Sequence, residues 1–316
     1  MSLDTSKINL HRALIFYAYI RENSKNEYVP LVVLMLKTEK IVKRLASKML
    51  NSTEFQRLER MFFLDAGHGY DAFGLHPEFI RFGAGLTRWP YESYFRVISK
   101  GSESIPKHGG AILAANHSGN LPIDGMMLWH DVLRNTNPPR VARGIADHFV
   151  PSLPFIGTLF SRGGMVGGSR GNVRNLLENG ELLMIFPEGT PGIIKPFSKR
   201  YQLQKFRVGH AELAIRNQVP IIPVGIIGAE EQLPSIVSSQ RLGQIFGIEA
   251  VPIPLFPLPL PVRYRIFYGK AITEHLSMDV WMADDPDVVS QLAQNVQQCV
   301  HDLIQQGLRE RKGIFV

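Results

Sequence analysis

From about residue 91 onward, short β-prone runs alternate with segments of helical periodicity, and this alternation leaves few possible folds. Apolar and β-branched runs predict strands over residues 94–98, 111–115, 141–145, 182–186, 221–227 and 262–268. Apolar residues at helical spacing predict helices over 126–133, 172–177, 209–216 and 287–308. Strands and helices in alternation are typical of layered α/β proteins. We therefore expect an α/β fold, with a mostly parallel central sheet flanked by helices.

The first ninety residues differ, because they have the pattern of helices without intervening strands. Apolar stripes, such as the one that includes Leu10 and Leu14, predict helices between residues 8 and 64. A Gly-rich turn follows them. We therefore divide the chain into an N-terminal helical region over 1–90, a candidate for membrane association, and a second domain over 91–316.

The charge of the chain favours anionic partners. The 316 residues carry a formal net charge of +7. Phosphate groups, anionic lipid and an acidic carrier protein are partners of this kind. The Lys and Arg residues are scattered, however, and no zinc-finger or RNA-binding pattern accompanies them. We therefore expect no nucleic-acid partner.

The single cysteine, Cys299, limits redox and metal chemistry. One thiol cannot form an internal disulfide, and no Cys/His cluster has the spacing of a zinc site. We therefore expect no bound metal and a reducing compartment such as the cytoplasm.

The apolar runs are too short to form a membrane-spanning helix. The two longest, 29–36 and 251–262, fall far short of the ~20 residues that such a helix needs. The second run contains five prolines, which exclude a helix. Charged residues also interrupt the N-terminus where a signal peptide would have its apolar core. We expect a cytoplasmic protein that is peripheral at the inner face of a membrane.

The first polar cluster, Asn116-His117 with Asp124, follows the predicted strand over 111–115. A carboxylate that accepts from one nitrogen of a histidine ring fixes the tautomer, so that the other nitrogen can take a proton from a hydroxyl. Asp is also a favoured N-cap, and Asp124 precedes the predicted helix over 126–133. The residues themselves leave two interpretations open, a catalytic pair and a capped turn.

The second polar cluster, Glu188-Gly189-Thr190, follows the predicted strand over 182–186. Gly189 would allow a ligand to approach the backbone closely, and Glu188 and Thr190 would hydrogen-bond that ligand. The same residues are also consistent with a turn that ends a buried strand. Because sites in parallel sheets gather at the carboxyl ends of the strands, we expect both clusters at one edge.

Residues 167–171 contain two further candidates, Arg170 and Ser169. Arg170 stands at the start of a predicted helix, where an arginine suits an anion, although a solvated surface arginine is the alternative. Ser169 fits the G-x-S-x-G pattern of serine hydrolases, so a serine esterase or lipase is a rival function. A nucleophile elbow needs a clear strand before the serine, and residues 161–166 form a poor one.

Four blocks together resemble the glycerolipid acyltransferase family, which includes the lysophosphatidic acid acyltransferases. The blocks are the Asn-His…Asp cluster and residues 164–170, 186–190 and 219–225, and they occur in the family's order within about 93–270. The resemblance implies that residues 91–316 form an acyltransferase domain. Members transfer a fatty acyl group from acyl-CoA or acyl-carrier protein to glycerol 3-phosphate, lysophosphatidate or a related alcohol.

The resemblance also implies roles for the candidate residues. His117 would be the general base that deprotonates the acceptor hydroxyl, and Asp124 would orient it, with no acyl-enzyme. Arg170 and the cluster Glu188-Gly189-Thr190 would bind the acceptor. No bound cofactor is implied, because acyl-CoA or acyl-carrier protein is a co-substrate.

Two departures from the family pattern bear on the acceptor. The commonest family spacing is His-x4-Asp, whereas His117 and Asp124 have six residues between them. The longer form is similar to a bacterial branch that resembles mono- and diacylglycerol acyltransferases. The family also often has an arginine directly after Glu-Gly-Thr, where Pro191 stands here. Lys195, or another nearby basic residue, is a candidate substitute, and a phosphate-free acylglycerol is an alternative acceptor.

A second rival function is non-enzymatic. A basic protein of this fold could bind lipid at a membrane surface through its N-terminal helices and the run over 251–262. The pair of His117 and Asp124 favours an enzyme, because lipid binding alone does not need a proton relay.

Overall fold

A seven-stranded sheet forms the centre of the molecule. The computed structural model describes residues 40–118, 122–146, 156–239 and 251–316. The strand order is β1-β9-β6-β2-β5-β3-β4. The strands are β1 (Ile98–Lys100), β2 (Ala111–Ala115), β3 (Ala142–Ala146), β4 (Val166–Gly167), β5 (Leu182–Ile185), β6 (Ile221–Ile227) and β9 (Arg265–Tyr268). Neighbouring strands are parallel except for the pair β6–β9, which confirms the predicted mostly parallel sheet.

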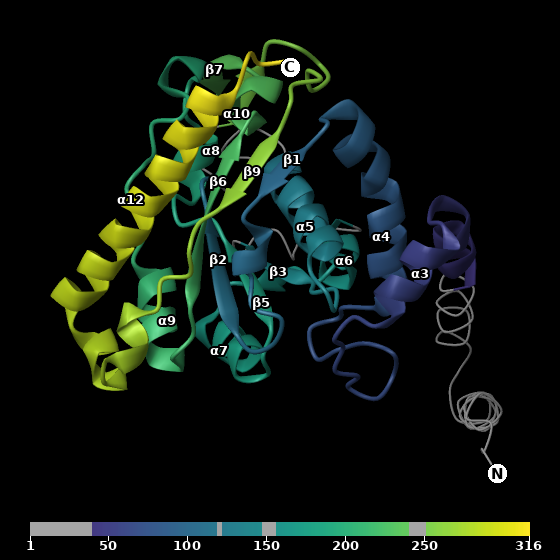
Figure 1. The fold of residues 1–316 in the computed structure, drawn as a ribbon, viewed down its shortest axis with the longest axis horizontal. Coiled ribbons are helices and arrows are strands. Elements are labelled where there is room, and N and C mark those ends of the chain that lie inside the picture. The colour runs from purple at the N-terminus through teal and green to yellow at the C-terminus, as the bar shows by residue number, and fades with distance from the viewer. Residues whose placement is uncertain (1–39, 119–121, 147–155, 240–250) are drawn as a thin grey trace.

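Helices cover both faces of the sheet (Figure 1). They are a helix over 40–49, α3 (Ser52–Glu59), α4 (Pro77–Trp89), α5 (Ile123–Asn135), α6 (Ile156–Arg162), α7 (Arg170–Glu178), α8 (Thr190–Ile193), α9 (Gly209–Asn217), α10 (Ala229–Gln232) and α12 (Pro286–Glu310). In Figure 1, α12 and α9 lie on one side of the sheet, and α5 and α4 lie on the other. Within the described ranges, no helix is both long enough and apolar enough to cross a bilayer.

The central strands are buried on both faces, which explains their continuous apolar sequence. Along β2, Ile112 and Ala114 pack in a cluster with residues of α7, α9 and α12. The alternate residues Leu113 and Ala115 pack in a second cluster with residues of α5. Side chains therefore alternate between two apolar layers, as the pleat of a strand requires.

One predicted strand is wrong, and one small sheet was not predicted. The predicted strand over 94–98 is wrong, because a π-helix, η1 (Pro90–Tyr94), continues from α4 and β1 begins only at Ile98. The aromatic residues there have high β-propensity, but a tertiary contact outweighs it and favours the helical conformation. The hydroxyl of buried Tyr91 donates to Asp131, at 2.5 Å. A small two-stranded sheet, β7 (Ser235–Ser239) with β8 (Val251–Pro254), was not predicted.

Residues on both sides of the predicted domain boundary share one hydrophobic cluster. Leu58 and Ile80 pack there with Leu133 of α5. Arg143 of β3 also forms a buried ion pair with Asp71, with 2.6 Å between Nη1 and Oδ2. The boundary near residue 90 stays a prediction, and most of the predicted N-terminal helices fall in residues 1–39, outside the described part of the chain.

The direction of β1 and β9 determines which segments meet at the edge of the sheet where β2 ends. Arg265, the first residue of β9, lies opposite Ile227, the last residue of β6. Ile98, the first residue of β1, in turn pairs with Arg265. The segments that precede β1 and β9 therefore lie at the edge where β2, β5 and β6 end. We call this the carboxyl edge.

Asn116 fixes the end of β2 at this edge. Its fully buried amide bridges to β6, because Nδ2 donates to the carbonyl of Ile226 at 3.0 Å and Oδ1 accepts from the Ile226 amide at 2.7 Å. The side chain thus replaces a strand residue in the hydrogen-bond ladder. His117, the next residue, leaves the sheet from a fixed position.

Candidate active site

His117 and Asp124 are in direct contact at the carboxyl end of β2. Nδ1 of His117 lies 2.7 Å from Oδ2 of Asp124. The carboxylate is fully buried, whereas the imidazole is 15% exposed. The ring also stacks on Phe186, which follows β5, with 4.3 Å between the ring centroids. Two neighbouring strands therefore hold the imidazole at the surface of the carboxyl edge.

Asp124 contacts the imidazole, and it is not the N-cap residue that the sequence offered as the alternative. It lies in the first turn of α5, whose N-cap residue, Pro122, makes no side-chain cap. Oδ1 accepts from the amide of Gly125 at 2.7 Å, and Oδ2 accepts from the amide of Ser118 at 2.8 Å. The helix dipole also stabilises an anion at this position. The carboxylate thus binds the start of the helix and the imidazole at the same time.

Glu188 joins the ends of β2 and β5. Its buried Oε1 accepts from the backbone amide of His117 at 3.0 Å. Oε2 accepts from the amide of Gln204 at 2.7 Å and from Nζ of Lys195 at 3.2 Å. Each bond holds a different segment, so the carboxylate fixes the backbone around the histidine.

Lys195 lies between two carboxylates in the interior. Its side chain is 4% exposed, and Nζ contacts Glu230 Oε1 at 3.1 Å as well as Glu188. Burial raises the pKa of Glu230 from 4.5 to about 7, although Lys195 acts in the opposite direction. This lysine is engaged inside the protein, so it is a poor candidate for binding a substrate phosphate.

Gly189 lies against an arginine that the sequence did not single out. Gly189 has φ +60°, and a Cβ at this position would be 2.8 Å from Cζ of Arg207. Arg207 is exposed, and its guanidinium therefore sits directly on Gly189 of the Glu-Gly-Thr loop. Arg207 is distant in sequence from the motif, and only the fold brings it there.

Arg170 and Ser169 lie farther along the same edge. Ser169 is the N-cap of α7, and its Oγ accepts from the amide of Asn172 at 3.2 Å. Arg170 is 84% exposed and pairs with Glu212 at 3.2 Å. Two strands separate β4 from β2, so about 14 Å of sheet lies between them. The structure therefore brings together His117, Asp124 and Glu188, with Arg170 on the flank.

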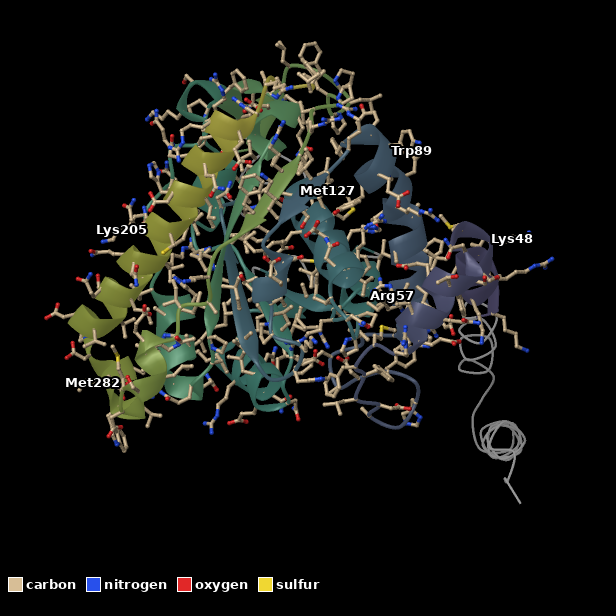
Figure 2. The ribbon with its side chains drawn as sticks, viewed as in Figure 1. Lys48, Arg57, Trp89, Met127, Lys205 and Met282 are labelled. Atoms are coloured by element: carbon tan, nitrogen blue, oxygen red, sulfur yellow. The ribbon has the colours of Figure 1, made fainter. Side chains whose placement is uncertain are left out.

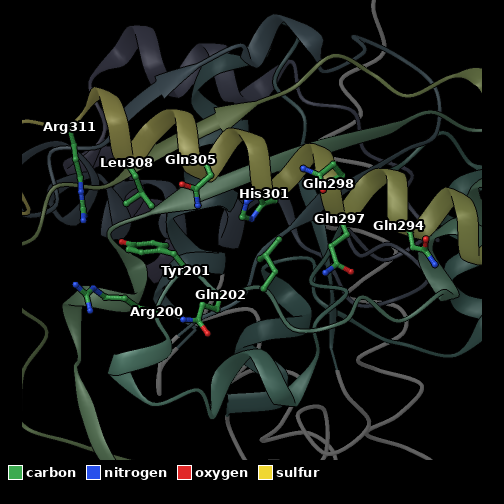
Figure 3. A pocket seen from close by; sticks show the side chains of 11 residues that line it. Arg200, Tyr201, Gln202, Gln294, Gln297, Gln298, His301, Gln305, Leu308 and Arg311 are labelled. Atoms are coloured by element: carbon green, nitrogen blue, oxygen red, sulfur yellow. The ribbon is translucent and has the colours of Figure 1, made fainter.

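A cavity lies between α12 and residues 200–203 (Figure 3). Its volume is about 820 Å³, and its lining includes Gln297, His301 and Arg311. None of the predicted site residues is among the side chains that line it. Across the described ranges, no three His, Cys, Asp or Glu side chains are grouped to hold a metal ion.

Comparison with known proteins identifies the family. A model of the acyltransferase family matches residues 96–227, which include every predicted site residue. An uncharacterized protein of Mycobacterium tuberculosis is 37% identical over 264 residues, which are 80% of this chain and 73% of that protein. A Mycobacterium leprae protein is 35% identical over 267 residues, 80% and 71% of the two chains. The chain belongs to the acyltransferase family.

More distant matches agree with this assignment and confirm the family that the four sequence blocks indicated. The human DGAT1/2-independent enzyme synthesizing storage lipids is 28% identical over 174 residues, which are 54% of the acyltransferase described here and 52% of the human protein. The crystal structure of the 1-acyl-sn-glycerophosphate acyltransferase PlsC from Thermotoga maritima has the same fold. The superposition covers 97% of this chain and 99% of the Thermotoga maritima chain, with a TM-score of 0.51 and 18% sequence identity.

The raised pKa of Glu230 predicts a pH dependence of stability. The folded acyltransferase holds a proton on this carboxyl up to about pH 7, whereas the unfolded chain releases it near pH 4.5. The stability that the protonated group confers is therefore complete below about pH 4.5 and is lost as the pH rises through 7. Glu230→Gln, which stays neutral, should gain on the order of 1–3 kcal/mol relative to wild type between these pH values.

Urea unfolding at several pH values would measure this difference. Glu178→Gln is the matched control, because Glu178 is exposed and pairs with Arg174 on the surface of α7. A difference between Glu230→Gln and wild type that stays constant with pH would contradict the prediction.

Proposed function

We propose that this acyltransferase moves a fatty acyl group from a thioester, acyl-CoA or acyl-carrier protein, to a hydroxyl group of a glycerolipid. The contact between His117 and Asp124, at 2.7 Å, is the observation that carries the proposal. A buried carboxylate beside a partly exposed imidazole at the carboxyl edge is suited to general-base catalysis. The acceptor is a lysophospholipid, a glycerol phosphate or an acylglycerol.

The reaction follows from the orientation of the imidazole. Asp124 accepts a hydrogen bond from Nδ1–H of His117, so Nε2 is free to take the proton of the acceptor hydroxyl. The acceptor oxygen forms a bond to the thioester carbonyl carbon, and the C–S bond then breaks. The thiolate that leaves takes the proton from Nε2. No acyl-enzyme forms, and no cofactor or metal ion takes part.

The acceptor lies along the carboxyl edge in this proposal. Gly189 and Thr190 contact its polar group, and Arg170 is available at the flank for an anionic part of either substrate. Glu188 supports binding indirectly, because both of its oxygens hold backbone or lysine groups. Arg207 supplies a positive charge beside the Glu-Gly-Thr loop. It takes the place of the arginine that other family members often have where Pro191 stands here.

The relatives support a lipid substrate. The human relative is named for the synthesis of storage lipids, and the Thermotoga maritima protein for acylation of 1-acyl-sn-glycerophosphate. Both names concern lipids. A lipid acceptor would keep the protein at a membrane, and we propose that it is cytoplasmic and peripheral at the inner face of that membrane.

Replacing His117 or Ser169 separates the proposed mechanism from that of a serine esterase. His117→Ala should lower kcat by about 10²–10⁴-fold, because the base is lost. Ser169→Ala removes an N-cap, so it should lower the stability by about 1 kcal/mol and leave kcat near that of wild type. Thioester consumption with a panel of glycerolipid acceptors is the measurement. Loss of turnover in the serine variant alone would favour the esterase.

Asp124→Asn tests the orientation of the imidazole. The amide oxygen can still accept from one backbone N–H, but the NH₂ group that replaces Oδ2 would donate to Nδ1 and favour the wrong tautomer of His117. We expect a loss of about 10²-fold or more in kcat, with the melting temperature recorded to verify that the variant is folded. Turnover near wild type would mean that Asp124 serves only the start of α5.

Arg207→Gln tests phosphate recognition. A lost charge-assisted hydrogen bond should lower kcat/KM about tenfold or more for acceptors with a phosphate and leave uncharged acylglycerols unaffected. Arg174→Gln is the control, because Arg174 is exposed on α7. An equal decrease with both acceptor classes would argue against a phosphate contact at Arg207.

A further inference from the structure

Exposed apolar side chains gather at the carboxyl edge, beside the proposed site. They come from the end of α4, from the loop after β8 and from the last residues of the sequence. Trp89 is 63% exposed and Leu258 is 73% exposed. We call the following set the apolar rim: Leu86, Trp89, Leu255, Phe256, Leu258 and Phe315. Contiguous apolar patches of this kind on a protein surface mark a site of interaction.

Hydrogen bonds and ring contacts hold the three segments of the apolar rim together. Trp89 packs on Tyr94, with 5.5 Å between the ring centroids, and the Tyr94 hydroxyl donates to the carbonyl of Pro259 at 2.5 Å. Arg96 donates to the carbonyl of Pro261 at 2.7 Å and to that of Phe315 at 3.1 Å. The three segments are therefore linked to one another, and their apolar side chains belong to one continuous surface.

The topology places this surface at the same edge of the sheet as His117. The loop after β8 leads into β9, and the segment after Trp89 leads into β1. Both strands begin at the carboxyl edge, where β2 ends and His117 follows. Figure 2 shows Trp89 at the upper end of α4, and Figure 1 shows the chain before β9 at the same end of the molecule.

The charge around the apolar rim is positive. Residues 86–97, 255–263 and 311–316 contain five basic side chains and one acidic side chain, Glu92, which is itself ion-paired. Arg311 is matched by Glu231, at 2.7 Å, which leaves Arg96, Arg263 and Lys312 as the excess positive charge of these segments. Such a combination of apolar side chains and basic groups is suited to a surface of anionic lipid.

A second exposed apolar cluster serves as an internal comparison, because its charge is opposite. It contains Trp281 and Met282 of the 3-10 helix η6 (Val280–Asp284), and Figure 2 shows Met282 at the end of the molecule away from Trp89. Residues 274–287 include five acidic side chains and no Lys or Arg. An anionic bilayer would repel this segment and attract the apolar rim.

We propose that the apolar rim docks on an anionic lipid bilayer and so holds the carboxyl edge, with His117, against the membrane. Leucine and phenylalanine side chains from the loop after β8 enter the interface, and Trp89 lies at the level of the headgroups, as tryptophan prefers. An acceptor lipid then reaches the imidazole without leaving the bilayer entirely. The docking itself does not depend on the proposed function. Only the identity of the acceptor lipid rests on that function.

Tryptophan quenching would test which end of the protein meets the lipid. The chain has three tryptophans, and none lies in residues 1–39, so the fluorescence reports on the described part alone. Two variants of the full chain leave one exposed tryptophan each: Trp129→Phe with Trp281→Phe, and Trp129→Phe with Trp89→Phe. On phosphatidylglycerol vesicles with brominated acyl chains, Trp89 fluorescence should fall by roughly half and Trp281 fluorescence should stay unchanged.

Substitutions in the apolar rim would test its contribution to binding. The double variant Leu255→Ser, Leu258→Ser should partition onto phosphatidylglycerol vesicles at least about tenfold more weakly than wild type. The control variant Trp281→Ser, Met282→Ser should bind as wild type does. The leucine variant should keep its turnover of a short-chain, water-soluble acceptor, because both leucines are exposed and neither is a residue of the proposed site.

Three results would overturn the docking proposal. They are quenching of Trp281 as strong as that of Trp89, vesicle binding unchanged in the leucine variant, and a dimer of wild type that the leucine variant loses while its vesicle binding persists. The last result would identify a second copy of the chain as the occupant of the apolar rim. Vesicle docking as expected, without His117-dependent acyl transfer, would instead contradict the proposed function and leave the docking intact.

Discussion

The buried carboxylate of Glu188 is the constraint on which the site depends. A carboxylate in the interior is costly unless its oxygens are hydrogen-bonded or paired with a charge. Glu188 meets this condition through the His117 amide, the Gln204 amide and Lys195. These three partners come from the end of β2, from the segment beside the cavity and from the loop after α8. The hydrogen bonds and the ion pair of the Glu188 carboxylate therefore hold three segments of the carboxyl edge together. The backbone amide of His117 is fixed by Glu188, and its ring is fixed by Asp124.

The lysine between Glu188 and Glu230 also explains how the site differs from the pattern of its family. The sequence offered Lys195 as a substitute for the missing arginine after Glu-Gly-Thr. Its side chain is instead enclosed, and its charge is used to hold two carboxylates. Arg207 takes the exposed position on the loop, from a different part of the chain. A positive charge is thus present near the loop, although no residue of the motif provides it.

Local pattern predicted the central sheet well, because buried parallel strands have continuous apolar sequences bounded by polar turns. The bounds of β2 and β6 agree with the predicted strands over 111–115 and 221–227. The same reasoning identified both polar clusters and placed them at one edge. It missed α4 and the π-helix after it, where burial of Tyr91 against Asp131 outweighs β-propensity. Contacts between residues distant in sequence, including the contact of Arg207 with Gly189, depend on the completed fold. The local sequence pattern does not indicate them.

The way in which Asp124 is held has a consequence for how such enzymes are found in genomes. The carboxylate is anchored to the first turn of α5, and His117 is anchored to the end of β2, so the two anchors belong to separate rigid elements. The distance of 2.7 Å between Nδ1 and Oδ2 is therefore set by the packing of helix on sheet, and the number of residues between them is not what maintains it. A search that fixes this spacing at four would pass over the chain, whereas a search for the geometry would find it.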